Sequence, residues 1–228
     1  MVNPHETIHR RDFLGGLAAT AVGLSALALP ARLLADQKMP PPASNNKDFE
    51  SWLKKIKGKH RQVYDAPSTN GGLPLVWSRV FLMSNAQLGV KENDMTSVLV
   101  LRHDAIPYAM SDEMWQKYSF GENFNVKNMM TKARQSSNIY WKPKEDLPIP
   151  GMSVDKLLES GVLIGVCDLA LSFDSMHVAS KMNLDATEVK KEWVANIFPG
   201  IQIVPSGVIA VNRAQEHGCT YCFAGGEG

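Results

Sequence analysis

Short apolar runs recur along the chain from about residue 60 to the C-terminus, and turn-forming residues separate them. Three of the runs are almost continuously apolar, which is typical of parallel strands that are buried on both faces. Two shorter runs have the length and the residue types of further strands. The pattern therefore predicts five strands, at residues 61–65, 96–102, 163–167, 201–204 and 220–223.

The segments between these runs have the apolar spacing of helices. A capping-box pattern begins at Ser153, with an acid in the first turn, and Ser206 is a natural N-cap. Strands that alternate with helices predict one α/β domain over residues 47–228, with a mainly parallel central sheet flanked by helices on both faces. The expected helices are 48–57, 75–88, 153–160, 169–182, 186–196 and 207–217.

Residues 1–35 have the features of an export signal. Arg10 and Arg11 precede Asp-Phe-Leu, and an apolar run follows at residues 14–29. The run is shorter than the roughly 20 apolar residues of a membrane span. The paired arginines resemble a twin-arginine signal, with a general secretory signal or an uncleaved anchor as the alternatives.

Three alanines, Ala28, Ala31 and Ala35, fit the small-residue pattern that precedes a signal cleavage site. Residues 36–46 include three consecutive prolines and are expected to form a flexible leader. The mature protein is therefore expected to be periplasmic or otherwise exported, without a stable membrane span. Its signal makes the export machinery an expected partner.

Residues 119–150 interrupt the alternation of strands and helices. They have no clean periodicity and contain three prolines. A long irregular insertion in a compact domain is usually a lid, an interface element or disorder. Tyr140 and Trp141 in this insertion could cover a pocket or pack against another subunit.

The composition is that of an ordinary globular protein. The chain has 228 residues, 44% apolar and 21% charged, and a net charge of +1. This balance gives no indication of nucleic-acid binding. Three cysteines exclude a full disulfide framework within one chain. The chain also lacks the phosphate-binding loop, dinucleotide-binding and serine-hydrolase motifs, which disfavours those activities.

Chemically active residues follow the predicted strands. Ligands of open parallel sheets bind outside the carboxyl ends of the strands. A helix that begins there also offers free N–H groups to an anion. One cysteine, one histidine, several acids and one helix start are thus expected to converge. They are Asp65, His103, Asp104, Cys167, Asp168, Ser206 and Gly207.

Three segments together resemble the DsrE/DsrF-like family. They are Glu-Ser-Gly-Val-Leu-Ile-Gly-Val-Cys at 159–167, Phe-Pro-Gly-Ile-Gln-Ile-Val-Pro-Ser-Gly-Val at 198–208, and Val-Leu-Val-Leu-Arg-His-Asp-Ala-Ile at 98–106. The resemblance covers roughly residues 60–224 apart from the insertion. It implies a single α/β domain that assembles as a homotrimer or hexamer. Some members relay sulfur as a cysteine persulfide, and Cys167 matches the cysteine that they use.

The position of Cys167 also gives a physical reason to expect a reactive thiol. Helix N-termini and nearby cations lower the pKa of a thiol, and the thiolate is the reactive form. Cys167 stands where a strand passes into a helix, although Asp168 beside it opposes this effect. A buried structural cysteine is the alternative. His103 could pair with Cys167, act as a general base, or only hydrogen-bond within its turn.

Cys219 and Cys222 form a C-x-x-C motif that overlaps the last predicted strand. Residues three apart on a strand face opposite sides, which suits neither a disulfide nor shared metal ligation. In a C-terminal loop the two could instead form a redox pair, remain free or bind a metal. Three hypotheses remain: a persulfide carrier that uses Cys167, a non-enzymatic ligand- or partner-binding module, and a thiol-redox protein. The sequence identifies neither a cofactor nor a metal.

Overall fold

The computed structural model of the protein describes residues 39–142 and 147–226. The predicted export signal and the start of the leader lie outside these residues. Among the described residues, no helix is long and apolar enough to cross a membrane.

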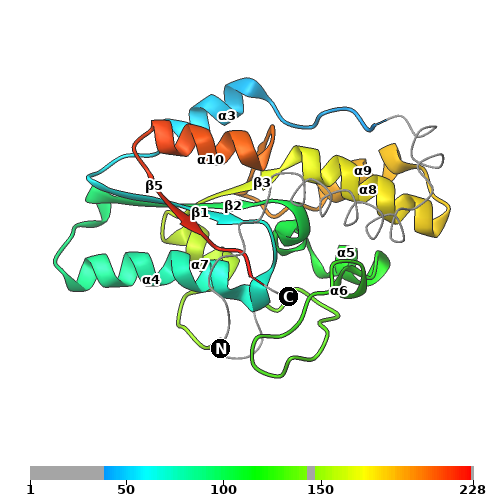
Figure 1. Ribbon diagram of the computed structural model, residues 1–228, viewed down its shortest axis with the longest axis horizontal. Helices are drawn as coiled ribbons and strands as arrows, with labels where there is room; N and C mark the ends of the chain where they lie inside the picture. Colours follow the sequence, from blue (N-terminus) through cyan, green and yellow to red (C-terminus); the bar gives the residue numbers. More distant parts are fainter. Residues whose placement is uncertain (1–38, 143–146, 227–228) are drawn as a thin grey trace, which may run out of the picture. The chain divides into compact units, whose positions relative to one another are not determined.

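A central sheet of five parallel strands organises the domain (Figure 1), in the order β4-β3-β2-β1-β5. Each strand lies within one residue of its predicted bounds, and in the middle of the sheet the buried apolar runs mark the strands directly. The α/β class and the parallel sheet are therefore confirmed. The strands are β1 (His60–Ala66), β2 (Met95–Leu101), β3 (Leu163–Cys167), β4 (Gln202–Val204) and β5 (Thr220–Phe223).

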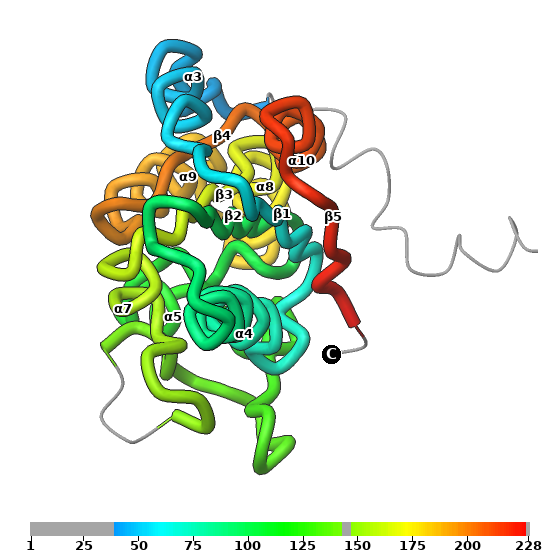
Figure 2. Tube along the Cα trace, turned by 90° about the vertical axis from the view of Figure 1, so that its left-hand side faces the viewer, coloured from blue at the N-terminus to red at the C-terminus, as the bar shows by residue number. Residues whose placement is uncertain are grey.

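Alternate side chains along the strands point to opposite faces of the sheet. Val63, Val98 and Val100 pack with helices α3 (Asn46–Leu53) and α10 (Gly207–Glu216). The intervening Tyr64 and Leu99 belong to a second, larger cluster. On that face lie α4 (Leu73–Gln87) and α7 (Val154–Glu159), as Figure 2 shows. Helices thus cover both faces, as predicted.

Helix α10 connects the two edges of the sheet. It follows β4 at one edge and leads to β5 at the other, so it must cross the face between them. It packs against β1, β2 and β3 on the way. Because α10 begins directly after β4 and the strands are parallel, its N-terminus lies at the carboxyl ends of the strands.

Helices α8 (Asp168–Met182) and α9 (Ala186–Ala195) do not cover a face of the sheet in the usual way. They pack on each other, and α8 packs on the 3-10 segment η4 (His103–Ala109) that follows β2. Figure 1 shows them beyond the carboxyl ends of the strands. Shorter turns η2 (Asn70–Gly72) and η3 (Glu92–Asp94) complete the first half of the domain.

The described residues of the insertion pack into the domain and include a short helix, α6 (Phe120–Asn123), after α5 (Asp112–Lys117). Tyr140 is buried, its ring meets that of Tyr108 edge-on, and its hydroxyl donates to the Gly71 carbonyl at 2.6 Å. Trp141 stacks on Phe198. Tyr140 therefore packs within the domain, and the partly buried Trp141 packs on Phe198, while its contact with a pocket or another subunit stays a prediction.

Two local predictions about helix starts had different outcomes. Ser206 caps α10, and its hydroxyl accepts the N–H of Ile209 at 3.2 Å. Ser153 occupies the N-cap position of α7, but its side chain makes no capping hydrogen bond. Residue 156, three positions on, is Lys, so the reciprocal bond of a capping box is also missing.

Candidate functional site at the strand ends

The carboxyl ends of the strands do bring several predicted residues together. Asp65 is near the end of β1, Cys167 ends β3, and Ser206 and Gly207 follow β4. Arg102, which directly follows β2, stands in the middle of this set. The parallel topology places all four strand ends at one edge of the sheet.

Asp65 and Arg102 form a two-point ion pair. The guanidinium donates to the two carboxylate oxygens at 2.6 and 3.0 Å, and the hydroxyl of Tyr221 donates to one of them at 3.0 Å. The Arg102 side chain is 26% exposed, while that of Asp65 is buried. The hydrogen bond to Asp65 raises the pKa of Arg102 above its ordinary value. The site therefore holds a permanent cation near solvent.

Gly207 allows helix α10 to begin directly against Arg102. A Cβ atom at Gly207 would lie 2.6 Å from both Cβ and Cδ of Arg102, so a side chain at this position would force one of the two residues to shift. The N-terminus of α10 therefore abuts the stem of Arg102. One N–H of this helix start is already bound by the Ser206 hydroxyl, so Ser206 acts as a cap within the chain.

Cys167 occupies the N-cap position of α8. Its Sγ accepts the N–H of Ala170 at 3.3 Å, and the residue is only 5% exposed. Leu101 and Val166 are partners in the pairing of β2 with β3, so Arg102 and Cys167, which follow them, lie next to each other at the end of the sheet. The thiol thus combines a helix N-terminus, a nearby cation and near-complete burial.

His103 does not join this group. Its side chain is 68% exposed, and its Nδ1 pairs with the carboxylate of Asp104 at 3.0 Å. No contact among the described residues joins His103 to Cys167. Asp174 of α8 faces this pair instead, and burial raises its pKa to about 7, with opposite smaller effects of His103 and Asp104.

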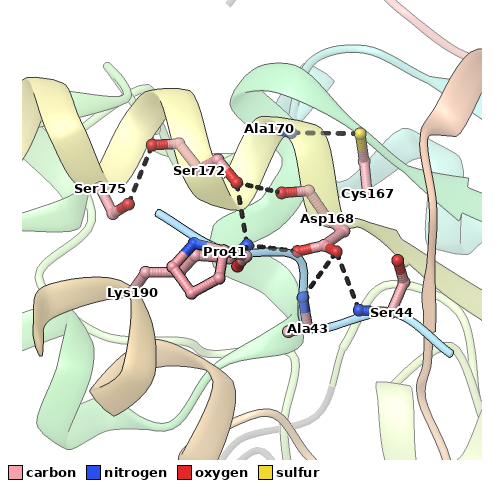
Figure 3. A network of polar contacts seen from close by, with 9 residues as sticks. All are labelled: Pro41, Ala43, Ser44, Cys167, Asp168, Ala170, Ser172, Ser175 and Lys190. Carbon is pink, nitrogen blue, oxygen red and sulfur yellow. Dashed lines mark hydrogen bonds and ion pairs between the residues drawn. The ribbon is translucent and has the colours of Figure 1, made fainter. Parts of the chain in front are cut away.

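Asp168 also points away from the strand-end site, although it follows Cys167 directly. Its carboxylate is buried and bound by Lys190 and by the main chain of the leader (Figure 3). Residues 40–44, which the sequence reading assigned to a flexible leader, therefore lie fixed against α8 and α9. The sequence does not point to Lys190 as a buried residue. In a polar segment, helical spacing does not distinguish a buried lysine from a surface lysine.

The C-terminal cysteines are both free thiols. Cys219 is buried with α3 and α10, and burial raises its pKa to about 11. Cys222 packs against the cluster on the opposite face. The two side chains therefore cannot pair without turning one residue over. Within the described ranges, no group of three or more His, Cys, Asp or Glu residues could hold a metal.

A separate cleft of about 490 Å³ lies between the end of α5 and α9. Lys117 and Glu192 in its wall are paired, with Nζ at 2.6 and 2.7 Å from the two carboxylate oxygens. Tyr118 donates to the same carboxylate. The charges of this wall are thus satisfied by each other, and no predicted site residue lines the cleft.

Comparison with known proteins gives no identification: no family model matches the chain, and no curated protein is similar to it. The functional reading therefore depends on the geometry of the strand-end site and on the sequence segments that resemble the DsrE/DsrF-like family.

Proposed function

We propose that this chain is an exported DsrE/DsrF-like protein in which Cys167 carries sulfane sulfur as a persulfide. The observation that carries the proposal is the hydrogen bond that Sγ accepts from the Ala170 N–H at the start of α8. A helix N-terminus stabilises negative charge, and a thiolate or a persulfide anion at this atom would benefit. Export and assembly as a homotrimer or hexamer belong to the same proposal and rest on the sequence resemblance.

Arg102 gives a second reason to assign anion chemistry to this site. Its guanidinium is held in a fixed orientation by Asp65 and remains partly exposed. A cation near a thiol favours the ionised sulfur. Arg102, which the sequence alone does not indicate as a site residue, thus gives the strongest support for a reactive thiol at Cys167.

The reaction needs no redox partner. The Cys167 thiolate attacks the outer sulfur of a donor persulfide, the donor's S–S bond breaks, and the donor leaves as a thiolate. The outer sulfur, now bonded to Cys167, is passed to an acceptor thiolate by the same exchange. No net oxidation occurs, because the sulfane sulfur keeps its oxidation state throughout.

A binding module for a small anion is the second candidate. The burial of Cys167 and the partial exposure of Arg102 favour it, because a ligand could reach the guanidinium without touching the sulfur. In this case the site would hold an anion through Arg102 and the function would survive loss of the thiol.

The two candidates are separated by treating the purified whole protein with a low-molecular-weight persulfide and measuring its intact mass. The first candidate predicts a gain of one sulfur atom that disappears in Cys167→Ser and persists in Cys219→Ser and Cys222→Ser. Arg102→Met should slow the gain but leave its site unchanged. A wild-type protein that gains no sulfur, with Cys167 reactive only after unfolding, would contradict the carrier role and favour the anion-binding module.

A further inference from the structure

The first turn of α8, which donates to Cys167, is held from its other side by the leader. In Figure 3 the leader runs beneath this turn, and the thiol lies above it. The network between them consists of charged and main-chain groups with short contacts. We refer to residues 40–44, which run from Pro40 to Ser44, as the strap.

The ammonium group of Lys190 has three partners. Its Nζ lies 2.6 Å from Oδ1 of Asp168, 2.9 Å from the Ser172 hydroxyl and 2.7 Å from the carbonyl of Pro41. The contact with Asp168 is an ion pair, and the other two are hydrogen bonds that Lys190 donates. The strap supplies one of the three acceptors.

Asp168 depends on the strap even more. Its Oδ2 accepts the main-chain N–H groups of Ala43 and Ser44, both at 2.8 Å. Burial alone would raise the pKa of Asp168, but the hydrogen bonds from Lys190 and Ser44 outweigh burial and hold it below its ordinary value. The strap thus provides both donors to one oxygen of a carboxylate whose side chain is only 3% exposed.

Removal of the strap would leave this buried pair incomplete. One donor of Lys190 and one oxygen of Asp168 would lose their partners, and an unsatisfied buried charge is costly. The first turn of α8 would have to move so that water could reach them. Asp168 is the first residue of this turn, and Ala170 donates to Cys167 from the same turn.

We infer that the strap and Lys190 position the first turn of α8 and thereby control the accessibility of Cys167. Lys190 is a positioning residue, since it acts on the thiol through Asp168 and touches neither the sulfur nor a substrate. The strap does not cover the thiol. Docking of the strap keeps the thiol shielded, and undocking exposes it. The consequence for sulfur transfer rests on the proposed function, whereas the coupling itself does not.

The test is the rate at which iodoacetamide alkylates each cysteine of the folded whole protein, read by peptide mass spectrometry. Lys190→Met should speed alkylation of Cys167 by about tenfold or more, because local opening is no longer opposed by the buried pair. Lys191→Met is the matched control on the same helix and should change the rate less than about twofold, since exposed ion pairs contribute little. Cys219, which is also buried, reports any global unfolding.

A milder variant tests the strap itself. Ala43→Pro removes one N–H donor to Asp168, and a fourth proline fits the row that begins at Pro40. It should speed alkylation of Cys167 by about threefold, with Cys219 unchanged. Ala43→Ser keeps the N–H at this exposed position and is the matched control.

The results distinguish this inference from the proposed function. Faster alkylation of Cys167 with Cys219 unchanged supports the strap, whether or not Cys167 accepts sulfur. If Ala43→Pro leaves Cys167 unchanged, or raises Cys167 and Cys219 in parallel, the coupling is wrong. If alkylation responds as expected but no persulfide forms at Cys167, the inference about the strap is supported and the carrier role is contradicted.

Discussion

Asp65 and Asp168 stand at the carboxyl ends of two strands of one sheet, and each carboxylate holds one cation. The pair of Asp65 and Arg102 lies near solvent, and its third partner is the hydroxyl of Tyr221. The pair of Asp168 and Lys190 is sealed from solvent, with 3% exposure on each side chain. The first pair leaves part of its cation exposed to solvent, whereas the charges of the second pair hold residues 40–44 against α8 and α9.

The difference between the pairs follows from where their partners originate. Arg102 and Tyr221 come from the sheet, so the first pair is complete as soon as the strands are aligned. The second pair needs α9 and residues about 125 positions away in the chain. Water can replace a lost partner at the exposed pair but not at the sealed one. Loss of a partner should therefore be more costly at Asp168.

The largest expected effect is the loss of the buried cation. Lys190→Met leaves the carboxylate of Asp168 without its charge partner and should lower the free energy of unfolding by about 3–5 kcal/mol. Urea denaturation at pH 7 measures this change. The double variant Asp168→Asn with Lys190→Met should recover part of the loss, because no uncompensated charge remains buried. A loss below about 1 kcal/mol in the single variant would contradict the sealed character of the pair.

Arg102→Met tests the exposed pair and should cost less, about 1–3 kcal/mol in the same denaturation experiment. Asp65 keeps the hydroxyl of Tyr221, and solvent enters where the guanidinium stood. Arg102→Lys should fall between wild type and Arg102→Met, because lysine keeps the charge but not the two-point geometry. A cost greater than that of Lys190→Met would reverse the comparison.

Asp174 sharpens the comparison because no ion pair within the described part of the chain holds its carboxylate. One of its oxygens is buried without a hydrogen-bond partner, and its pKa is raised from 3.8 to about 7. Because the pKa of Asp174 is raised in the folded state, its ionised form destabilises the fold. The stability that the neutral side chain preserves is therefore fully present below about pH 4 and is lost as the pH rises to about 7.

Asp174→Asn removes this pH-dependent cost. The variant should exceed wild type in stability by an amount that grows between pH 4 and 7, and by about 1–2 kcal/mol at pH 8, since partial solvation limits the effect. Denaturation at pH 5 and pH 8 checks the growth. An advantage of equal size at both pH values would mean that packing, and not charge, explains the variant.

The sheet could be predicted from the sequence because burial on both faces leaves a direct mark. The run 163–167 is apolar at every position apart from Gly165, and it forms β3 with the predicted bounds. The N-cap of α10 could also be predicted, because the Ser206 hydroxyl accepts a hydrogen bond from its own turn. Local interactions of this kind need no knowledge of the rest of the fold.

The rest depended on contacts between distant segments. Asp168 was expected at the strand-end site with Cys167, but the first turn of α8 directs it to the other side. A row of prolines reads as a flexible leader, and only the buried pair at Asp168 and Lys190 explains why it is held. Arg102 stands at the end of an apolar run, and the run itself gives no sign that Asp65 and Gly207 lie against its side chain.

The smallest expected effect completes the comparison on one helix. Lys191 follows Lys190 directly, but its side chain is 75% exposed and lies 3.5 Å from Glu188, which is also exposed. Lys191→Met should change the free energy of unfolding by no more than about 0.5 kcal/mol, because water solvates both charges and salt screens them. Urea denaturation at low and high salt measures it, with Lys190→Met alongside. Equal losses at the two positions would show that helix α9 responds to any lost lysine, and the buried pair would then have no special part in holding the strap.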